Sequence, residues 1–335
     1  MKFFDTLIVF FILNLFIFIS FDRINLFKLI VDKPDNFRKF HKKKIPLAGG
    51  IILFINILIY FIILNFNKNL ISTEIFFYNL NDLNYFIFTC CLIFLIGVID
   101  DKIDLNASKK FLLLILILIQ FIFLSNDTLI KSINLSFLDN PIYLGKYSFF
   151  FTLFCFLVFL NAFNMFDGIN LQSSSYSLII LIYFSYLGPK SILVIFLIIF
   201  ILFFMCLNFL SKSFLGDSGT LLISFILSFI FIKLFNNQII LNSDEILIYM
   251  LIPGIDMIRL FFERIKNNRN PFSNDRLHLH HLLLSKYSYF KTIFIINLFI
   301  ILPILANHVG ISKLKIIIIT ISIYFLSIWS IKKFN

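Results

Sequence analysis

The chain has 335 residues, of which 60% are hydrophobic and 14% are charged. Its mean hydropathy of +0.98 excludes a soluble protein whose surface must be covered by water. The formal net charge of +11 would suit nucleic acid. However, the basic residues lie in loops between apolar runs, so we expect membrane lipid and no nucleic acid as a partner.

About eleven apolar runs follow one another, each close to the length of roughly 20 residues that spans a bilayer. They are continuous rather than alternating, which favours helices over the strands of a barrel. We therefore expect an all-α, polytopic integral membrane bundle of about 11 (10–11) transmembrane helices, forming a single domain over residues 1–335. The runs cover residues 6–26, 48–66, 85–99, 111–125, 148–163, 172–187, 191–210, 220–235, 246–262, 292–308 and 314–331.

The charges predict an orientation for the bundle. The first run has no small-residue cleavage site, and Asp22, Arg23 and Lys28 interrupt its far end, so we expect a retained first span. All odd-numbered runs exit to one side, which carries roughly 18 Lys and Arg against about 7 on the other. The more basic side is expected in the cytoplasm, which puts the N-terminus outside.

Polar clusters follow the odd-numbered runs, so all of them face this more basic side. The loops on the other side hold scattered polar residues with no convergent pattern. If the clusters were only loop filler, the two sides should look alike. We therefore expect one composite active site on the cytoplasmic face. Its parts are PLAGG at 46–50, GVIDDKIDL at 97–105, NAFNMFDGIN at 161–170, SFLGDSGT at 213–220 and DRLHLHH at 275–281.

The carboxylates in these clusters suit a hard cation or a proton acceptor. Asp100 and Asp101 are adjacent at a helix end and should point in different directions, while Asp104 should return to their face one turn later. Asp217 lies in a turn of small residues that lets a ligand approach closely. Mg²⁺ is usually held by one or two carboxylates plus substrate phosphates. Solvation or helix capping explains any one of these aspartates equally well, but the gathering of all of them on one side favours function.

Three histidines stand together near the end of the chain. With Arg276, the side chains of His278, His280 and His281 can donate hydrogen bonds to phosphate or sugar oxygens. A zinc site is the alternative, because imidazole is a common metal ligand. The absence of a nearby cysteine in the sequence, and aspartates that are typical of magnesium, favour the phosphate or sugar contact.

Six motifs together resemble a known family, the polyprenyl-phosphate N-acetylhexosamine-1-phosphate transferases (glycosyltransferase family 4). They stand in the family's order and spacing between about residues 31 and 290 and are most similar to its bacterial undecaprenyl-phosphate α-N-acetylglucosaminyl 1-phosphate transferase branch. The muramoyl-pentapeptide transferase of peptidoglycan synthesis is a less similar alternative, because the last loop has DRLHLHH after NPFS. The motifs are VDKPDNFRKFHKKKIPLAGG, GVIDDKIDL, NAFNMFDGIN, FLGDSG, IPGIDMIRLFFERI and NPFSNDRLHLHHLL.

The resemblance implies a reaction. Undecaprenyl phosphate attacks the β-phosphate of a UDP-N-acetylhexosamine, most commonly UDP-GlcNAc, giving undecaprenyl-diphospho-N-acetylhexosamine and UMP. This would be the first membrane step of a cell-surface polysaccharide such as O-antigen, common antigen, capsule or teichoic acid. The resemblance also implies Mg²⁺ as cofactor with Mn²⁺ as a substitute, the bacterial inner membrane as the location, and a homodimer by family analogy.

The resemblance further implies roles for residues. Asp100, Asp101 and Asp167 are the expected catalytic carboxylates; one of the first two would accept or orient the proton of the lipid phosphate, and which one stays open. Asp217 and Asn164 are the expected Mg²⁺ ligands. The expected UDP-sugar contacts are Asn161, Asn170, Arg276, His278, His280 and His281, with Asp167 at the nucleotide. The expected lipid-phosphate contacts are Lys33, Arg38 and His41.

One motif departs from the family. The bacterial members usually have Asp-Gly-x-Asp-Gly where this chain has Asp167-Gly168-Ile169-Asn170-Leu171. If the fourth position binds metal, the loss of its charge would be damaging. If it contacts uracil, an amide offers both a donor and an acceptor, and the related dolichyl-phosphate enzymes have asparagine there. We favour the uracil contact and a working enzyme, with altered sugar-nucleotide specificity as an alternative.

Other classes of function fit the sequence less well. A polytopic transporter or flippase should carry charges along a midplane pathway, whereas these carboxylates cluster at helix ends. The aspartate-rich intramembrane prenyltransferases should show two aspartate-rich repeats, and only DDKID is present. An inactive relative kept as a scaffold is suggested only by Asn170.

Overall fold

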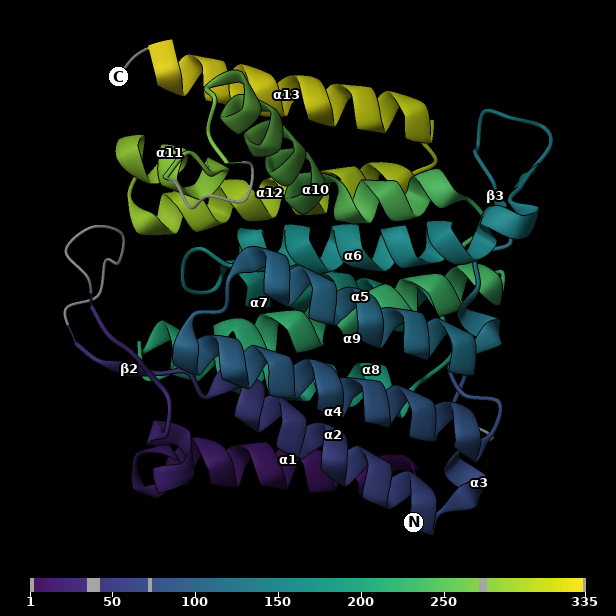
Figure 1. Ribbon diagram of the computed structural model, residues 1–335, viewed down its shortest axis with the longest axis vertical. Coiled ribbons are helices and arrows are strands. Elements are labelled where there is room, and N and C mark those ends of the chain that lie inside the picture. The colour runs from purple at the N-terminus through teal and green to yellow at the C-terminus, as the bar shows by residue number, and fades with distance from the viewer. Residues whose placement is uncertain (1–2, 35–42, 72–73, 271–275, 334–335) are drawn as a thin grey trace.

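The computed structural model describes residues 3–34, 43–71, 74–270 and 276–333. Over these residues the chain forms a bundle of helices that lie side by side, with two short two-stranded antiparallel sheets in the connections (Figure 1). The α-helices are α1 Phe3–Ser20, α2 Gly49–Phe66, α3 Lys68–Ile71, α4 Leu80–Ile103, α5 Ala107–Leu124, α6 Ser148–Phe166, α7 Gln172–Leu187, α8 Ile192–Phe209, α9 Gly216–Asn236, α10 Ser243–Lys266, α11 Leu279–Lys286, α12 Tyr289–His308 and α13 Lys313–Lys333. The strands are β1 Val31–Asp32, β2 Ile45–Pro46, β3 Ser132–Ile133 and β4 Ile142–Tyr143.

Each of the apolar runs in the sequence coincides with one long helix, and α3 and α11 are short additions. Nine of the helices in the described part of the chain are long and apolar enough to cross a membrane. The two other long helices are α7, with 16 residues, and α10, which contains several charged residues and Pro253. The expected all-α bundle is confirmed, and the chain is a multi-pass membrane protein.

Several helices extend beyond their apolar runs. α4 continues to Ile103 and α9 begins at Gly216, so that Asp100, Asp101 and Asp217 lie in terminal turns of helices rather than in loops. Asn164, one residue beyond its run, likewise lies in the last turn of α6, and Asn161 lies in the turn before it. A helix continues for as long as its backbone groups find partners, whereas an apolar run is defined by its side chains alone.

The helix α9 forms the centre of the bundle. In its most apolar window 94% of the residues are buried, against 22% for α1 and for α5. Its main neighbours are α4, α6 and α2. Because its apolar side chains point in every direction, α9 is suited to be surrounded by protein rather than by lipid. The first turn of α9 is therefore a fixed point around which the site is built.

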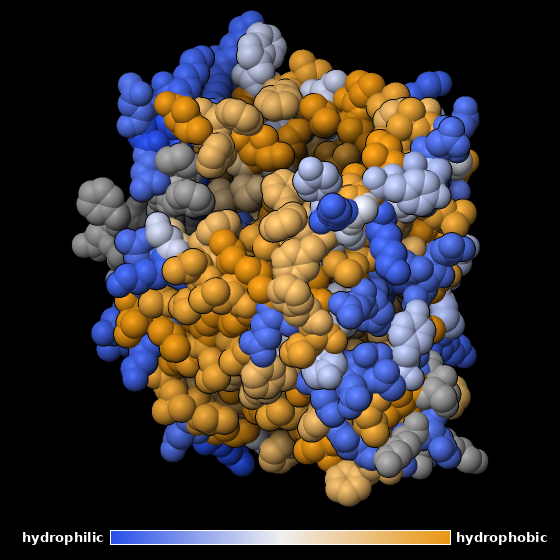
Figure 2. Space-filling model, turned by 45° about the vertical axis from the view of Figure 1, so that its right-hand side comes forward, coloured by the Kyte–Doolittle hydropathy of each residue, from blue (hydrophilic) through white to orange (hydrophobic). Residues whose placement is uncertain are grey.

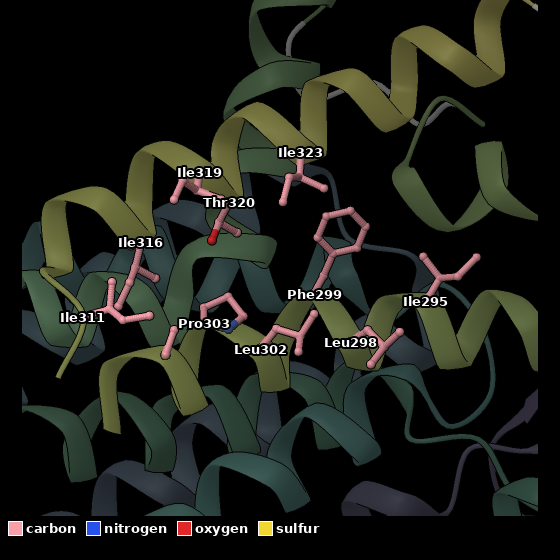
Figure 3. Close-up of a pocket in the computed structure, with 11 residues that line it drawn as sticks. Ile295, Leu298, Phe299, Leu302, Pro303, Ile311, Ile316, Ile319, Thr320 and Ile323 are labelled. Carbon is pink, nitrogen blue, oxygen red and sulfur yellow. The ribbon is translucent and has the colours of Figure 1, made fainter. Parts of the chain in front are cut away.

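The outer helices form the surface that faces lipid. Large apolar side chains such as Phe16, Phe150 and Trp329 are exposed on α1, α6 and α13. Figure 2 shows this wide apolar surface between more polar borders. An apolar groove of about 410 Å³ lies between α12 and α13, where Phe299, Leu302 and Ile319 contribute to its walls (Figure 3). Its lining includes no residue of the polar motifs, so the groove is separate from the candidate site.

Candidate active site

A lysine joins two aspartates from different helices. The Nζ atom of Lys110, in the first turn of α5, lies 2.6 Å from Oδ2 of Asp100 in α4 and 2.6 Å from Oδ1 of Asp217 in α9. The side chains of Lys110 and Asp100 are largely buried, while that of Asp217 is 35% exposed. A cation shared by two carboxylates reduces their mutual repulsion. Lys110 therefore ties α4, α5 and α9 together and leaves Asp217 open to an approaching group.

Asp101 binds the backbone at the start of α9. Its Oδ1 accepts the N–H of Asp217 over 2.7 Å, and its Oδ2 accepts the N–H of Ser218 over 3.0 Å. A carboxylate at a helix N-terminus satisfies free N–H groups and interacts favourably with the helix dipole. Gly216 makes the approach close, since its φ of +74° favours glycine and a Cβ there would lie 2.8 Å from Asp101 Oδ2. Asp101 thus fixes the position of Asp217.

Asp100 has different partners from its neighbour. Its Oδ1 accepts the N–H of Leu105 over 2.7 Å, and its Oδ2 binds Lys110. The expectation that the two adjacent carboxylates point in different directions is confirmed. Asp104 was expected on their face, and this expectation is wrong: Asp104 ends α4 with a left-handed φ of 49° and is exposed. The helix has to unwind there because the chain turns into α5 within a few residues.

The last turns of α6 lie against the start of α9. The hydroxyl of Thr220 donates to Oδ1 of Asn164 over 2.9 Å and lies 3.2 Å from the carbonyl oxygen of Asp217. The structure therefore brings Asn164 next to the turn that carries Asp217. Asn161 also lies on α6, but its amide donates to the carbonyl of Leu157 in its own helix over 2.7 Å.

Asp167 follows the end of α6 and lies near the same carboxylates. Its side chain accepts a hydrogen bond from the hydroxyl of Ser173. Burial, with a smaller contribution from the negative charges of Asp217 and Asp101, raises the pKa of Asp167 to about 7 against the opposing effect of the Ser173 hydrogen bond. A carboxyl group with a pKa near neutrality can hold or release a proton at physiological pH.

The donor set fits a magnesium ion that is completed by substrate. Asp217 and Asn164 offer oxygen ligands from adjacent helices, and the carboxylates around them outnumber the charge of Lys110. Within the described ranges, no three or more His, Cys, Asp or Glu side chains already stand as a metal-binding group. Mg²⁺ is commonly held by only one or two protein carboxylates, with waters and phosphates filling the remaining positions.

The residues that depart from the family motif close the loop between α6 and α7. The amide of Asn170 donates to the carbonyl of Asn208 over 3.0 Å and lies 3.4 Å from the hydroxyl of Ser211. Leu171 takes a left-handed φ of 65°, the conformation that glycine adopts most easily, and its N–H donates to Oδ1 of Asn208 over 2.7 Å. The hydroxyl of Tyr289 donates to the Asn170 carbonyl over 2.6 Å. The side-chain amide of Asn170 thus already donates to a group of the protein itself. Its contact with uracil stays a prediction.

The histidines lie against the end of α6. His280 is buried, and its ring is so close to Gly168 that a Cβ on the glycine would lie 2.0 Å from Nε2. The rings of His280 and His281 have centroids 4.3 Å apart, and the ring of His278 stacks on that of His280 at 5.3 Å. Burial and the neighbouring His281 and His278 hold the pKa of His280 well below its usual value. Residues 277–281, called the histidine segment from here on, therefore pack against the NAFNMFDGIN segment (161–170). The neutral imidazole of His280 lies at the contact between the two segments.

Two charged side chains of α10, Asp256 and Arg259, hold the histidine segment in place. Oδ2 of Asp256 lies 3.0 Å from Nδ1 of His278, and its Oδ1 accepts the N–H of Leu279 over 3.1 Å. Nη2 of Arg259 donates to Oδ1 of Asp256 over 2.8 Å and to the carbonyl of Leu277 over 2.6 Å. Both α10 side chains are buried. Three consecutive residues are thus fixed by one buried ion pair.

The remaining predicted contacts are at the surface or outside the described residues. Arg276 is exposed next to the histidine segment, and Lys33 is exposed just after β1. Arg38 and His41 lie outside the described residues. The segment around PLAGG returns to the site, because the carbonyl of Pro46 accepts the N–H of Phe214 over 2.9 Å just before α9.

Three site residues were not among the expected ones: Lys110, Asp256 and Arg259. Asp256 and Arg259 had a signal in the sequence, because charged side chains inside an apolar run are seldom there without a partner. Their spacing of three residues places them on one face of a helix. Lys110 had no such signal, since a lysine at the edge of an apolar run is ordinary in a membrane protein.

Comparison with known proteins finds a matching family model and similar curated proteins. Residues 83–235 match the model of glycosyl transferase family 4. Among curated proteins, the chain is similar to the undecaprenyl-phosphate alpha-N-acetylglucosaminyl 1-phosphate transferase of Escherichia coli O157:H7, with 29% identity over 267 residues that cover 76% of this chain and 69% of the relative. The protein of the same name from Salmonella typhi is 28% identical with the same coverage. That from Thermotoga maritima is 27% identical over 291 residues, which cover 84% of this chain and 81% of the relative.

The region of the family match contains the lysine-bridged carboxylates and the end of α6 with Asn164 and Asp167. The histidine segment and its α10 support lie beyond the match. The relatives cover most of this chain at a similar level of identity. Residues 83–235 of this chain are therefore similar to glycosyl transferase family 4.

Proposed function

We propose that this protein transfers GlcNAc 1-phosphate from UDP-GlcNAc to undecaprenyl phosphate, giving undecaprenyl-diphospho-GlcNAc and UMP. The observation that carries the proposal is the bridge from Asp100 through Lys110 to Asp217 at the ends of membrane helices, inside the region that matches the family. The names of the relatives support the same acceptor and sugar. Such a cluster suits a reaction between two phosphate groups, one of them attached to lipid.

The proposed reaction is a phosphoryl transfer. An oxygen of the lipid phosphate forms a bond to the β-phosphorus of the UDP-sugar, and the bond from that phosphorus to the bridging oxygen breaks, so that UMP leaves with the electron pair. Both reactants are anions, and a basic group between them lowers their repulsion. Lys110 would have this role, since its ammonium lies at the carboxylates that we assign to the lipid phosphate and to the metal.

Asp100 is the better candidate to accept or orient the proton of the lipid phosphate. Both oxygens of Asp101 bind backbone N–H groups of α9, so its release would disturb the helix that carries Asp217. Asp100 shares one oxygen with Lys110, whose flexible side chain can turn to an arriving phosphate. Asp167, with its pKa of about 7, can hold a proton close by.

Asp217 and Asn164 would hold Mg²⁺, which would neutralise charge on the diphosphate when bound. The protein's own contribution is to orient the two ligands. Asp101 fixes the backbone of Asp217, and the Thr220 hydroxyl fixes the amide of Asn164. We infer that the UDP-sugar lies between this turn and the histidine segment, where His278 and Arg276 offer hydrogen-bond donors.

We further propose that the end of the bundle with the carboxylates faces the cytoplasm of a bacterium and that the N-terminus lies outside. The excess of Lys and Arg in the loops on this side supports the orientation. UDP-sugars are made in the cytoplasm, so the donor would reach the site directly. A homodimer and the glycan that the product begins are expectations from the family.

The decisive assay incubates membranes that contain the protein with radiolabelled UDP-GlcNAc, undecaprenyl phosphate and Mg²⁺, and follows lipid-linked label and UMP. We expect both products in equal amounts. Parallel reactions with UDP-GalNAc and UDP-MurNAc-pentapeptide distinguish another aminosugar and the muramoyl-pentapeptide alternative. If no UDP-N-acetylhexosamine gives a lipid-linked product, the proposal is wrong.

Variants connect the product to the site. Asp217→Ala should abolish product formation while the protein still elutes as a folded species in detergent. Asp104→Ala is the matched control, since this exposed aspartate lies at the same end of the bundle and should leave product formation unchanged. Retained activity in Asp217→Ala would exclude its role as a metal ligand.

A further inference from the structure

The last helix reaches into the polar cluster of α10. The hydroxyl of Tyr324, in α13, donates to Oδ1 of Asp256 over 2.6 Å and accepts a hydrogen bond from Nε of Arg259 over 2.8 Å. Tyr324 is fully buried, with 0% exposure, and Asp256 and Arg259 are 4% and 6% exposed. Figure 1 shows α13 running across α10 on the side of the bundle that carries α11. A phenol from one helix is therefore part of the ion pair of another.

The tyrosine hydroxyl completes the set of partners of the ion pair. Oδ1 of Asp256 accepts from Tyr324, Arg259 and the backbone of Leu279, while Oδ2 faces His278. A carboxylate has about four acceptor positions, so this one is fully used. Without the phenol, Nε of Arg259 would be buried with no acceptor among the described residues, which is unfavourable. Arg259 would then shift, and its hydrogen bond to Leu277 would shift with it.

A second contact ties the same two helices. Glu263 accepts from Nη1 of Arg259 over 3.0 Å and binds Nζ of Lys332 over 3.0 Å. Lys332 lies two turns beyond Tyr324 on α13. Tyr324 thus contacts Arg259 directly, and Lys332 acts on it through Glu263. Arg259 in turn binds the carbonyl of Leu277 at the start of the histidine segment.

We propose that Tyr324 is a positioning residue: through Asp256 and Arg259, α13 sets the place and the ring orientation of His278 in the UDP-sugar site. The carboxylate at Nδ1 leaves Nε2 of His278 as the ring atom for the sugar nucleotide, as a carboxylate partner does for other functional histidines. The inference rests on the proposed function, since it assigns His278 to the UDP-sugar.

Kinetics of Tyr324→Phe test the proposal, because the change removes only the hydroxyl. We expect the KM for UDP-GlcNAc to rise about tenfold, while the KM for undecaprenyl phosphate stays within about twofold. Tyr249→Phe is the matched control: it removes another buried tyrosine hydroxyl, which contacts Glu245 and Asn307 at the other end of α10. Equal rises in both KM values, or the same rise in Tyr249→Phe, would overturn the proposal.

A double-mutant cycle shows whether Tyr324 acts through His278. If it does, Tyr324→Phe should add little to the KM of a His278→Ala protein, so that the two effects are not additive. Fully additive effects would overturn the proposed route. If Tyr324→Phe does not fold, Lys332→Met replaces it in the cycle. Loss of this exposed lysine frees Glu263 and so weakens its support of Arg259, and we expect the KM for UDP-GlcNAc to rise about twofold to threefold.

Hydrogen–deuterium exchange separates this inference from the proposed function. In Tyr324→Phe, the amide of Leu279 should exchange faster than in the wild type, while amides in α9 should be unchanged. Unchanged exchange at 277–279 would overturn the inference even in a fully active enzyme. A wild-type protein that makes no lipid-linked product would instead refute the proposed function. Faster exchange at 277–279 in the variant would then still show that Tyr324 in α13 positions the histidine segment.

Discussion

Asp101 holds the backbone of Asp217 in place, with its Oδ1 2.7 Å from the Asp217 nitrogen. The two residues are adjacent in space because Asp101 caps the helix whose first turn contains Asp217. The two adjacent aspartates therefore have different roles: Asp101 holds the start of α9 in place, and Asp100 binds Lys110.

Asp101→Ala should reduce stability as well as activity. Loss of a helix cap costs about 0.5–2 kcal/mol, and Asp217 loses its fixed position. Asp100→Ala should reduce activity at least as strongly with a smaller change in melting temperature. Thermal unfolding in detergent and the transfer assay measure the two effects. A melting temperature that falls equally in both variants would contradict this division.

Lys110→Met should lower kcat by about 100-fold or more, because a preorganised positive group next to transferring phosphates is lost. The apparent affinity for Mg²⁺ should rise, since the carboxylates would no longer share a lysine. A Mg²⁺ titration of initial rates measures both quantities. Lys109→Met is the matched control, because the neighbouring lysine is exposed and should leave kcat unchanged.

Gly168→Ala should destabilise the protein, since the new Cβ would lie 2.0 Å from Nε2 of His280. Overpacking of this kind costs about 1–3 kcal/mol. The double variant Gly168→Ala with His280→Ala should regain most of the melting temperature. Gly254→Ala is the control, because a Cβ there meets no atom of the described residues within 4 Å. No recovery in the double variant would argue against the proposed contact.

Asp167→Asn should change the dependence of stability on pH. The folded-state pKa of Asp167 is about 7, above the ordinary value of 3.8, so the folded chain binds more protons than the unfolded chain between these values. Stability from this group therefore falls as pH rises from about 4 to about 7 and then stays level. The variant should lose this slope and be more stable at pH 8, by on the order of 1–3 kcal/mol.

Melting temperatures between pH 5 and pH 8.5 test this prediction against Asp104→Asn. Glu74, whose pKa burial also raises to about 7, contributes the same slope to every variant and cancels in the comparison. Parallel curves for wild type and Asp167→Asn would show that Asp167 is not the group responsible.

Asn170→Asp should destabilise the loop between α6 and α7. The amide donates to the carbonyl of Asn208, and a carboxylate would put a second acceptor there. We expect a loss of about 1–3 kcal/mol with an unchanged Mg²⁺ requirement. A strong change in Mg²⁺ dependence would instead indicate a metal ligand, and a higher KM for UDP-sugar alone would indicate the uracil contact.

The bundle could be predicted from the sequence because bilayer thickness fixes the length of each apolar run. The helix ends could not be predicted as well. Asp217 lies inside a helix, since the carboxylate of Asp101 supplies hydrogen-bond partners that let α9 begin before its apolar run. Hydropathy contains no information about a cap that comes from another helix.

The site was predictable as a gathering of motifs but not as a set of contacts. Lys109 and Lys110 look alike in the sequence, and only the packing of α5 against α4 makes one of them a partner of Asp100. In the same way, the exchange of aspartate for Asn170 looked like a change at the nucleotide. Its hydrogen bond to Asn208 depends on where α8 ends, which no local pattern shows.

The burial of α9 has a consequence for biosynthesis. Its main neighbours, α2, α4 and α6, all precede it in the chain, so each of them has left the ribosome before α9 enters the membrane. The lysine-bridged carboxylates can therefore assemble as soon as α9 is inserted. The segment from α10 onward, with the histidines, is then added to a core that has already closed.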